Sequence, residues 1–229
     1  MNPQSLGEFL KSNVDQHRDA GVFELETDHM LQINLNGEVW IKMGGMVAYR
    51  GDIRFEREGL LSQGLGNLLK KAVSGEGARL TSARGSGQLY VADKGKRITL
   101  LQLSGESLFV NGNDLLAFEK SLEYSITMMR KVSAIASGGL FNVRLSGRGC
   151  LAITTHHRPL VLPVATGRPV FTDPQATVAW SASLSPDFKT DMQFKTLLGR
   201  GSGESFQMKF DGDGWVMVQP YEEEVMQAD

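Results

Sequence analysis

Two adjacent histidines, His156 and His157, are the residues of this sequence that most directly suggest metal chemistry. Neighbouring residues of a strand point to opposite faces, and at a turn we expect both imidazoles to lie in solvent. A cupin-type site needs a His-x-His pair with further Glu and His ligands downstream, and the sequence lacks that pattern. The other histidines, His17 and His29, are far away along the chain. We therefore predict no metal site and no bound cofactor.

The run Asp211-Gly212-Asp213-Gly214 resembles the start of a calcium-binding loop, and Glu222 stands at the twelfth position, where such loops place a bidentate ligand. Residues 215–218 between them alternate like a strand rather than a loop. We therefore predict a hairpin turn that joins 206–210 to 215–218. The acidic residues that follow, within 222–229, are expected to form a solvated tail.

Cys150 is the single cysteine, which rules out an internal disulfide. It falls in an alternating strand pattern, where a buried and inert thiol is the simpler interpretation, because reactive thiols need partial exposure and positive surroundings. Serines are abundant, but Gly85-Ser86-Gly87 and Gly201-Ser202-Gly203 are too tight for a nucleophile elbow. We predict that the protein is not an enzyme.

The overall composition is that of a soluble globular protein, with 41% apolar and 22% charged residues in 229. A net charge of −2 gives no general attraction to phosphate backbones, so we expect no nucleic-acid partner. The first residues do not resemble a signal peptide, and no apolar run reaches the roughly 20 residues that span a bilayer. These observations predict a cytoplasmic protein.

Alternation of apolar and polar residues dominates the chain and predicts strands. Short turn signals separate them, including Asn36-Gly37, which favours a type I′ hairpin turn. Strand pairs of this length and spacing predict an all-β sandwich or barrel. The further hairpins predicted are 30–35 with 39–41, 88–92 with 97–101, and 151–155 with 160–164.

Residues 84–122 align with 146–184 without a gap, and identical pairs include Gly85/Gly147 and Phe109/Phe171. We interpret the two segments as copies of one supersecondary unit. A shorter copy spans 30–53, where Trp40 falls on Phe109 and Tyr49 on Phe118. We predict that 199–219 completes this first copy in space. The expected organisation is a lead segment at 1–21, one β domain of three pseudo-repeats at 22–221, and the tail at 222–229.

One segment breaks the strand pattern, because apolar residues recur at helical spacing near 60–74 and predict a short amphipathic helix. Such a helix covers the open end of a barrel, or it contacts a membrane surface or a partner. Since 60–79 is the main element outside the repeats, we take it as the candidate interaction surface. The residues chosen are Leu61, Leu65, Leu68, Leu69, Lys70, Lys71 and Arg79.

Several motifs together resemble a known family in their order and spacing. They are Gly45-Met46-Val47-Ala48-Tyr49, Leu115-Leu116-Ala117-Phe118, Asp173-Pro174-Gln175-Ala176-Thr177-Val178-Ala179-Trp180-Ser181 and Gly212-Asp213-Gly214-Trp215-Val216-Met217-Val218-Gln219-Pro220. This chain resembles the altered-inheritance-of-mitochondria family (member twenty-four), bacterial branch, over about residues 22–221.

The resemblance implies a fold similar to the subunit of the tryptophan RNA-binding attenuation protein, a shortened double-stranded β-helix that forms rings or compact oligomers. It implies no established catalytic activity. Residues 75–79 depart from the family's commoner Gly-Glu-Ser-aliphatic-Phe form, so the local contact made there need not carry over.

Three functions are compatible with these observations. We favour a non-enzymatic interaction or scaffold module that forms a homo-oligomer, as a trimer or ring, because assembly would pair strand edges that are otherwise bare. The alternatives are a small-molecule-binding, cupin-like protein and a peripheral membrane protein that acts through residues 60–73. The identity of a protein partner does not follow from the sequence.

Overall fold

The computed structural model of the chain describes residues 3–15, 21–57, 80–128, 141–190 and 206–222. Within these ranges nearly all regular structure is strand, and the one helix, α1 (Leu6–Ser12), is short. The predicted all-β fold class is therefore confirmed. The helix predicted at 60–74 lies outside the described residues.

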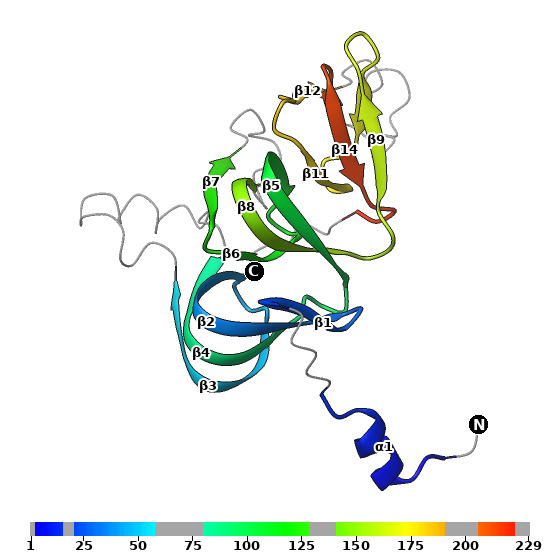
Figure 1. Cartoon of the computed structure of the whole chain (residues 1–229). Helices are drawn as coiled ribbons and strands as arrows, with labels where there is room; N and C mark the ends of the chain where they lie inside the picture. Colours follow the sequence, from blue (N-terminus) through cyan, green and yellow to red (C-terminus); the bar gives the residue numbers. More distant parts are fainter. Residues whose placement is uncertain (1–2, 16–20, 58–79, 129–140, 191–205, 223–229) are drawn as a thin grey trace, which may run out of the picture.

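The strands fall into three groups that follow one another along the chain (Figure 1). In the first group, β4 (Leu80–Val91) lies between β2 (Met30–Lys42) and β3 (Met46–Arg57) and pairs antiparallel with both. A short strand, β1 (Phe23–Thr27), adds to β2. The middle strand of the group is thus the last in sequence.

The second group has the same order. Its last strand, β8 (Phe141–Thr155), pairs with β5 (Arg97–Asn111) and also with β6 (Leu115–Glu119) and β7 (Leu122–Met128). Strands of this length curve, because a natural sheet twists as it extends.

In the third group each member is broken into two short strands. The last pair is central again: β13 pairs with β10 and β12, while β14 pairs with β9 and β11. The bounds are β9 (Leu160–Val164), β10 (Val170–Thr172), β11 (Thr177–Ser181), β12 (Asp187–Thr190), β13 (Phe206–Phe210) and β14 (Gly214–Val218).

One irregularity occurs at the equivalent place in all three groups, where the second strand pairs with the last. A β-bulge of this kind adds one residue and re-aims the side chains that follow it. Tyr49, Phe118 and Trp180 each stand one residue beyond the shift and therefore occupy corresponding positions. The shifts fall between Met46 and Ala48, between Leu115 and Ala117, and between Thr177 and Ala179.

Two junctions join the groups edge to edge. Residues 39–41 of β2 pair with 117–119 of β6, and residues 108–110 of β5 pair with 179–181 of β11. The resulting strand order is β3-β4-β2-β6-β8-β5-β11-β14-β9, which leaves β3 and β9 at the ends. In Figure 1 these two strands lie at opposite ends of the body.

The predicted hairpin pairings are wrong, although strands are present at those places. Asn36-Gly37 lies inside β2, where Gly37 has a positive φ of 124° that glycine adopts readily and the strand continues without a turn. Lys94 and Gly95 do form a tight turn with positive φ, but β4 and β5 on either side pair within their own groups. The same holds for β8 and β9, and for β13 and β14 across Asp211-Gly212-Asp213-Gly214. The turns after β4 and β8 pass the chain to the next group of strands, and the turn between β13 and β14 passes it from the small sheet to the large one.

The predicted completion of 30–53 by 199–219 is also wrong. The first group is completed by β4, whereas β13 and β14 pair with strands of the third group. The physical reason is that a Gly-x-Gly run bends the last strand of a group rather than opening the next. In β4, a Cβ on Gly85 would collide with the carbonyl oxygen of Asp52 on β3, so the bend requires glycine.

The core forms three adjoining clusters of buried apolar side chains. Phe118 and Phe210 are the largest fully buried side chains and belong to the second and third clusters. Burial of this apolar surface supplies the main driving force for folding.

Candidate functional site at the turns and the strand edges

The turns of all three groups are built in the same way. An amide at the end of the last strand of a group, or just beyond it, donates to a carbonyl in the turn between its first two strands. These bonds are Ala92 N to Gly45 O at 2.9 Å, Thr154 N to Asp114 O at 2.7 Å and Gln219 N to Ala176 O at 2.9 Å.

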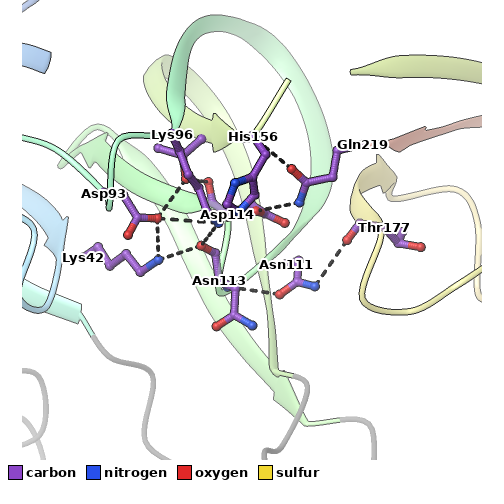
Figure 2. A network of polar contacts seen from close by, with 10 residues as sticks. Lys42, Asp93, Lys96, Asn111, Asn113, Asp114, His156, Thr177 and Gln219 are labelled. Atoms are coloured by element: carbon purple, nitrogen blue, oxygen red, sulfur yellow. Dashed lines mark hydrogen bonds and ion pairs between the residues drawn. The ribbon is translucent and has the colours of Figure 1, made fainter. Parts of the chain in front are cut away.

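Charged and polar side chains from these turns meet in one buried network, the turn cluster, shown in Figure 2. Lys42 Nζ lies 2.7 Å from Asp93 Oδ2, and Lys96 Nζ lies 3.1 Å from Asp114 Oδ1. Both lysines also donate to the carbonyl oxygen of Asn113. The four charges balance. Asp114 is fully buried and Lys96 nearly so, at 0% and 2% exposure.

The third group reaches the turn cluster through Gln219. Its Nε2 donates to Asp114 Oδ1 at 3.3 Å, and its Oε1 accepts the amide of His156 at 2.9 Å (Figure 2). The His156 imidazole stacks on Tyr221 with ring centroids 3.5 Å apart. His156 is therefore half-buried, and the prediction that both adjacent imidazoles lie in solvent holds only for His157.

Electrostatics show what the turn cluster does chemically. Burial alone would raise the pKa of Asp93, but the nearby ammonium of Lys42, the charge of Lys96 and the hydroxyl of Thr154 outweigh it and lower that pKa. A carboxylate kept ionised in this way is a poor general base. The arrangement instead ties together turns from all three groups, because a buried charge that lost its partner would carry a large desolvation cost.

Cys150 behaves as predicted for an inert thiol. Burial, with a smaller contribution from the Glu119 carboxylate, raises its pKa to about 11. Its amide donates to Glu119 Oε2 at 2.7 Å, which ties β8 to β6. Among the residues that the structure describes, no cluster of three His, Cys, Asp or Glu side chains has the geometry to hold a metal ion.

Each of the two closed junctions stacks a pair of aromatic rings, one fully buried and one half-buried. At the first, Trp40 of β2 stacks on Phe118 of β6, with centroids 6.3 Å apart. At the second, Phe109 of β5 stacks on Trp180 of β11 at 5.4 Å. Phe118 is 0% and Trp180 2% exposed.

A polar clamp reinforces the first junction. Glu38 of β2 accepts hydrogen bonds from Ser82 and Arg84 on β4 and from Lys120, which follows β6. Burial would raise the pKa of Glu38, but these donors lower it below its ordinary value. The carboxylate therefore stays charged where the two groups meet.

The outer edges of the array carry exposed apolar side chains. At the start of β3, Met46, Val47 and Tyr49 are all exposed, and β3 is the first strand in the sheet order. In the third group Phe171 of β10 is 47% exposed, and β10 is an edge strand of its small sheet. Leu160 and Val161 of β9 are exposed as well. We call these positions the open edges.

Helix α1 was not predicted. Leu6, Phe9 and Leu10 on it are exposed, and Figure 1 shows the helix standing away from the strands. Ser5 and Glu8 form a capping box, a signal that was available in the sequence as Ser-x-x-Glu. Just after the helix, Asp15 accepts hydrogen bonds from Arg50 and Tyr90.

The predicted interaction surface lies outside the described residues, so it stays a prediction: Leu61, Leu65, Leu68, Leu69, Lys70, Lys71 and Arg79. The sequence did not single out Asp93, Lys96 or Asp114, because polar residues in turns are usually solvated. It did align Trp40 with Phe109 and Tyr49 with Phe118, which was the available signal for the junctions.

Within the described residues, no helix has the length and apolar character to cross a membrane. No curated protein matches the sequence. A crystal structure of protein SPYM3_0169 from Streptococcus pyogenes is similar in fold, with a TM-score of 0.68 and 22% identity over 87% of this chain and 92% of that one. The model of the family described as mitochondrial biogenesis AIM24 matches residues 23–221. That match covers most of the sequence, and the chain therefore belongs to the AIM24 family.

Proposed function

We propose that this protein is a non-enzymatic interaction module that works as a homo-oligomer and scaffold. The observation that carries the proposal is the set of apolar side chains on strand edges that have no partner among the described strands, above all Tyr49 on β3 and Phe171 on β10. The cytoplasmic location expected above stays a prediction.

Unpaired edges present backbone donors and acceptors that invite another strand, and natural proteins usually protect them with charge, bulges or a covering segment. Here the start of β3 carries a bulge, yet it still presents apolar surface at Met46, Val47 and Tyr49. Since these side chains are already about half-buried, completing their burial in an assembly would contribute about 1 kcal/mol each. The polar groups of the turn cluster face inward and are bonded to one another, which supports a structural role for them.

Size-exclusion chromatography with light scattering tests this function on the full chain. At micromolar concentration we expect the mass of two or more chains, each of 25.1 kDa. A strict monomer across that range would contradict the proposal.

A second candidate function is attachment to a membrane surface through α1. The exposed face of Leu6, Phe9 and Leu10 on a helix that stands away from the body favours it. In liposome flotation, wild-type protein would rise with the vesicles and a Phe9→Lys variant would not. Recovery of all wild-type protein at the bottom of the gradient would remove this candidate.

A further inference from the structure

The two closed junctions predict a third that the described part of the chain leaves open. In each closed junction the first strand of one group pairs with the second strand of the next group. The third group's first strand and the first group's second strand, β10 and β3, remain without such a partner in the strand order of the described residues. We propose that a second copy of this chain fills the open junction, with β10 of one copy pairing antiparallel with β3 of the other. This inference rests on the proposed function and deepens it.

Register places β3 in the role that β6 and β11 have in the closed junctions. Ala48 and Tyr49 pair with Tyr90 and Leu89 on β4. After the same bulge, β6 and β11 pair with β8 and β14 in the same way: Ala117 and Phe118 with Ala152 and Leu151, and Ala179 and Trp180 with Met217 and Val216. Tyr49 is therefore the counterpart of Phe118 and Trp180.

Register also places β10 in the role of β2 and β5. Phe171 pairs with Lys209 of its own group, as Trp40 pairs with Ser82 and Phe109 with Arg144. Those two aromatic residues face Phe118 and Trp180 across the closed junctions. Applied to the open edges, the same register sets Phe171 opposite Tyr49, with Val170 opposite Arg50 and Thr172 opposite Ala48.

Exposure and chemistry agree with this pairing. The closed junctions each hold a stacked aromatic pair, one ring of which is fully buried, at interplanar angles of 20° and 19°. Tyr49 and Phe171 are 48% and 47% exposed, so both halves of a third pair are available on every chain. Tyr49 leans edge-on against Phe55 of the same strand, which holds its ring near this position. Cross-strand aromatic pairs stabilise a sheet beyond the area they bury.

The occupant is a second copy because β3 and β10 of one molecule cannot meet. The closed junctions hold the groups in line, and the first and third groups lie at opposite ends of the body (Figure 1). The contact uses two different surfaces, so it is head-to-tail, and repeated use of it gives a closed ring or a growing chain.

Cysteine cross-linking tests the register directly. In a Cys150→Ser background, a Tyr49→Cys chain is mixed with a tagged Phe171→Cys chain under mild oxidation. Directly opposed residues of antiparallel strands lie within disulfide reach, so we expect a disulfide-linked heterodimer. Each variant alone is the first control and should remain uncrosslinked. Tyr49→Cys mixed with Val161→Cys, which is exposed on β9, is the off-register control.

Charge substitution gives a second readout. Tyr49→Lys or Phe171→Lys should leave the melting temperature of the protomer within a few degrees, because both side chains are half-exposed. Either should weaken assembly about tenfold or more in light scattering, as loss of a central interface aromatic does. Phe9→Lys on α1 is the matched control and should assemble as wild type does.

The outcomes separate this inference from the proposed function. An assembled wild type that is insensitive to Tyr49→Lys and Phe171→Lys, and gives no 49–171 cross-link, overturns the open-edge contact but leaves the oligomeric module standing. In a further variant that carries both Tyr49→Cys and Phe171→Cys in the Cys150→Ser background, a disulfide within one chain would show that the chain closes on itself and would overturn the second copy as occupant. If Phe9→Lys dissociates the assembly while Tyr49→Lys and Phe171→Lys do not, the contact lies at α1 and the open-edge contact is overturned as well. A monomeric wild type contradicts the proposed function itself.

Discussion

Phe118 and Tyr49 hold corresponding positions in their groups, one residue beyond the same bulge, yet one is fully buried and the other is about half-exposed. The strand order gives one difference between their surroundings. β6 has β2 beside it at a closed junction, whereas β3 is the end of the strand order. The same comparison separates Phe109 of β5, which stacks on Trp180, from exposed Phe171 of β10.

Local sequence therefore sets the strand, the bulge and the aromatic side chain, while the neighbouring group decides whether that side chain is buried. The same structural position therefore stabilises the protomer at a closed junction and forms a contact surface at an open edge. Substitutions at a buried position and at its exposed counterpart test this difference.

The largest effect should come from removing a ring at a closed junction. Phe118→Ala should lower the free energy of unfolding by about 3–5 kcal/mol, because it leaves a cavity against Trp40 and Tyr124. Tyr49→Ala, at the corresponding open position, should cost less than about 1 kcal/mol in dilute monomer. Urea unfolding followed by tryptophan fluorescence measures both. Equal losses would contradict the comparison.

A comparable loss should follow from breaking the turn cluster. Asp114→Ala leaves the nearly buried Lys96 ammonium without its closest carboxylate, which should cost about 3–5 kcal/mol. The control is Asp28→Ala, which removes an exposed ion pair with Arg97 and should cost at most about 1 kcal/mol. If the two variants unfold at the same urea concentration, the turn cluster does not hold the groups together.

Acid should weaken the turn cluster before it affects the open edges. The pKa of Asp93 is lower in the folded protein than in the unfolded chain, so its contribution is complete above about pH 4 and is lost as pH falls through the folded value. Stability measured by urea unfolding between about pH 2 and 5 should therefore fall less steeply in Asp93→Asn than in wild type. An identical slope would show that Asp93 binds its proton equally in both states.

The smallest expected effect is on the rate at which a thiol reagent labels Cys150, which reports on the first closed junction. With a pKa of about 11, the native thiol is almost wholly protonated at neutral pH. Labelling by a thiol reagent should be on the order of a hundredfold slower than for a free cysteine. The rate should rise in Phe118→Ala, since Cys150 is bonded through Glu119 to β6. Fast labelling of the wild type would mean that the junction opens freely.

Much of the fold could be predicted from the sequence. Period-two alternation identified the all-β class, the positions of β9, β13 and β14, and parts of the longer strands β2, β4, β5 and β8. The alignment also placed Tyr49 with Phe118 and Phe109 with Phe171, which are the positions that matter at the junctions. These succeed because they depend on local patterns of side chains.

Strand partners could not be predicted in the same way. A tight turn such as Lys94-Gly95 has hairpin chemistry, but it passes the chain to the next group of strands, and its residues do not encode which strands will pair. Gly212-Asp213-Gly214 was predicted as a hairpin turn and not as a bend in the last strand of a group. The reason is that Gly201-Ser202-Gly203 has the same residues as Gly85-Ser86-Gly87. The turn cluster forms only where turns that are distant in sequence meet, so the pattern of one segment cannot predict it.

The bulge that recurs in β3, β6 and β11 also has a consequence for how the chain reaches its native state. Three near-equivalent second strands offer three similar docking sites to the first strands, so swapped partners compete with correct ones while the protein is still forming. Refolding at high protein concentration should favour such exchanges between molecules, so the yield of native protein should fall as the protein concentration rises.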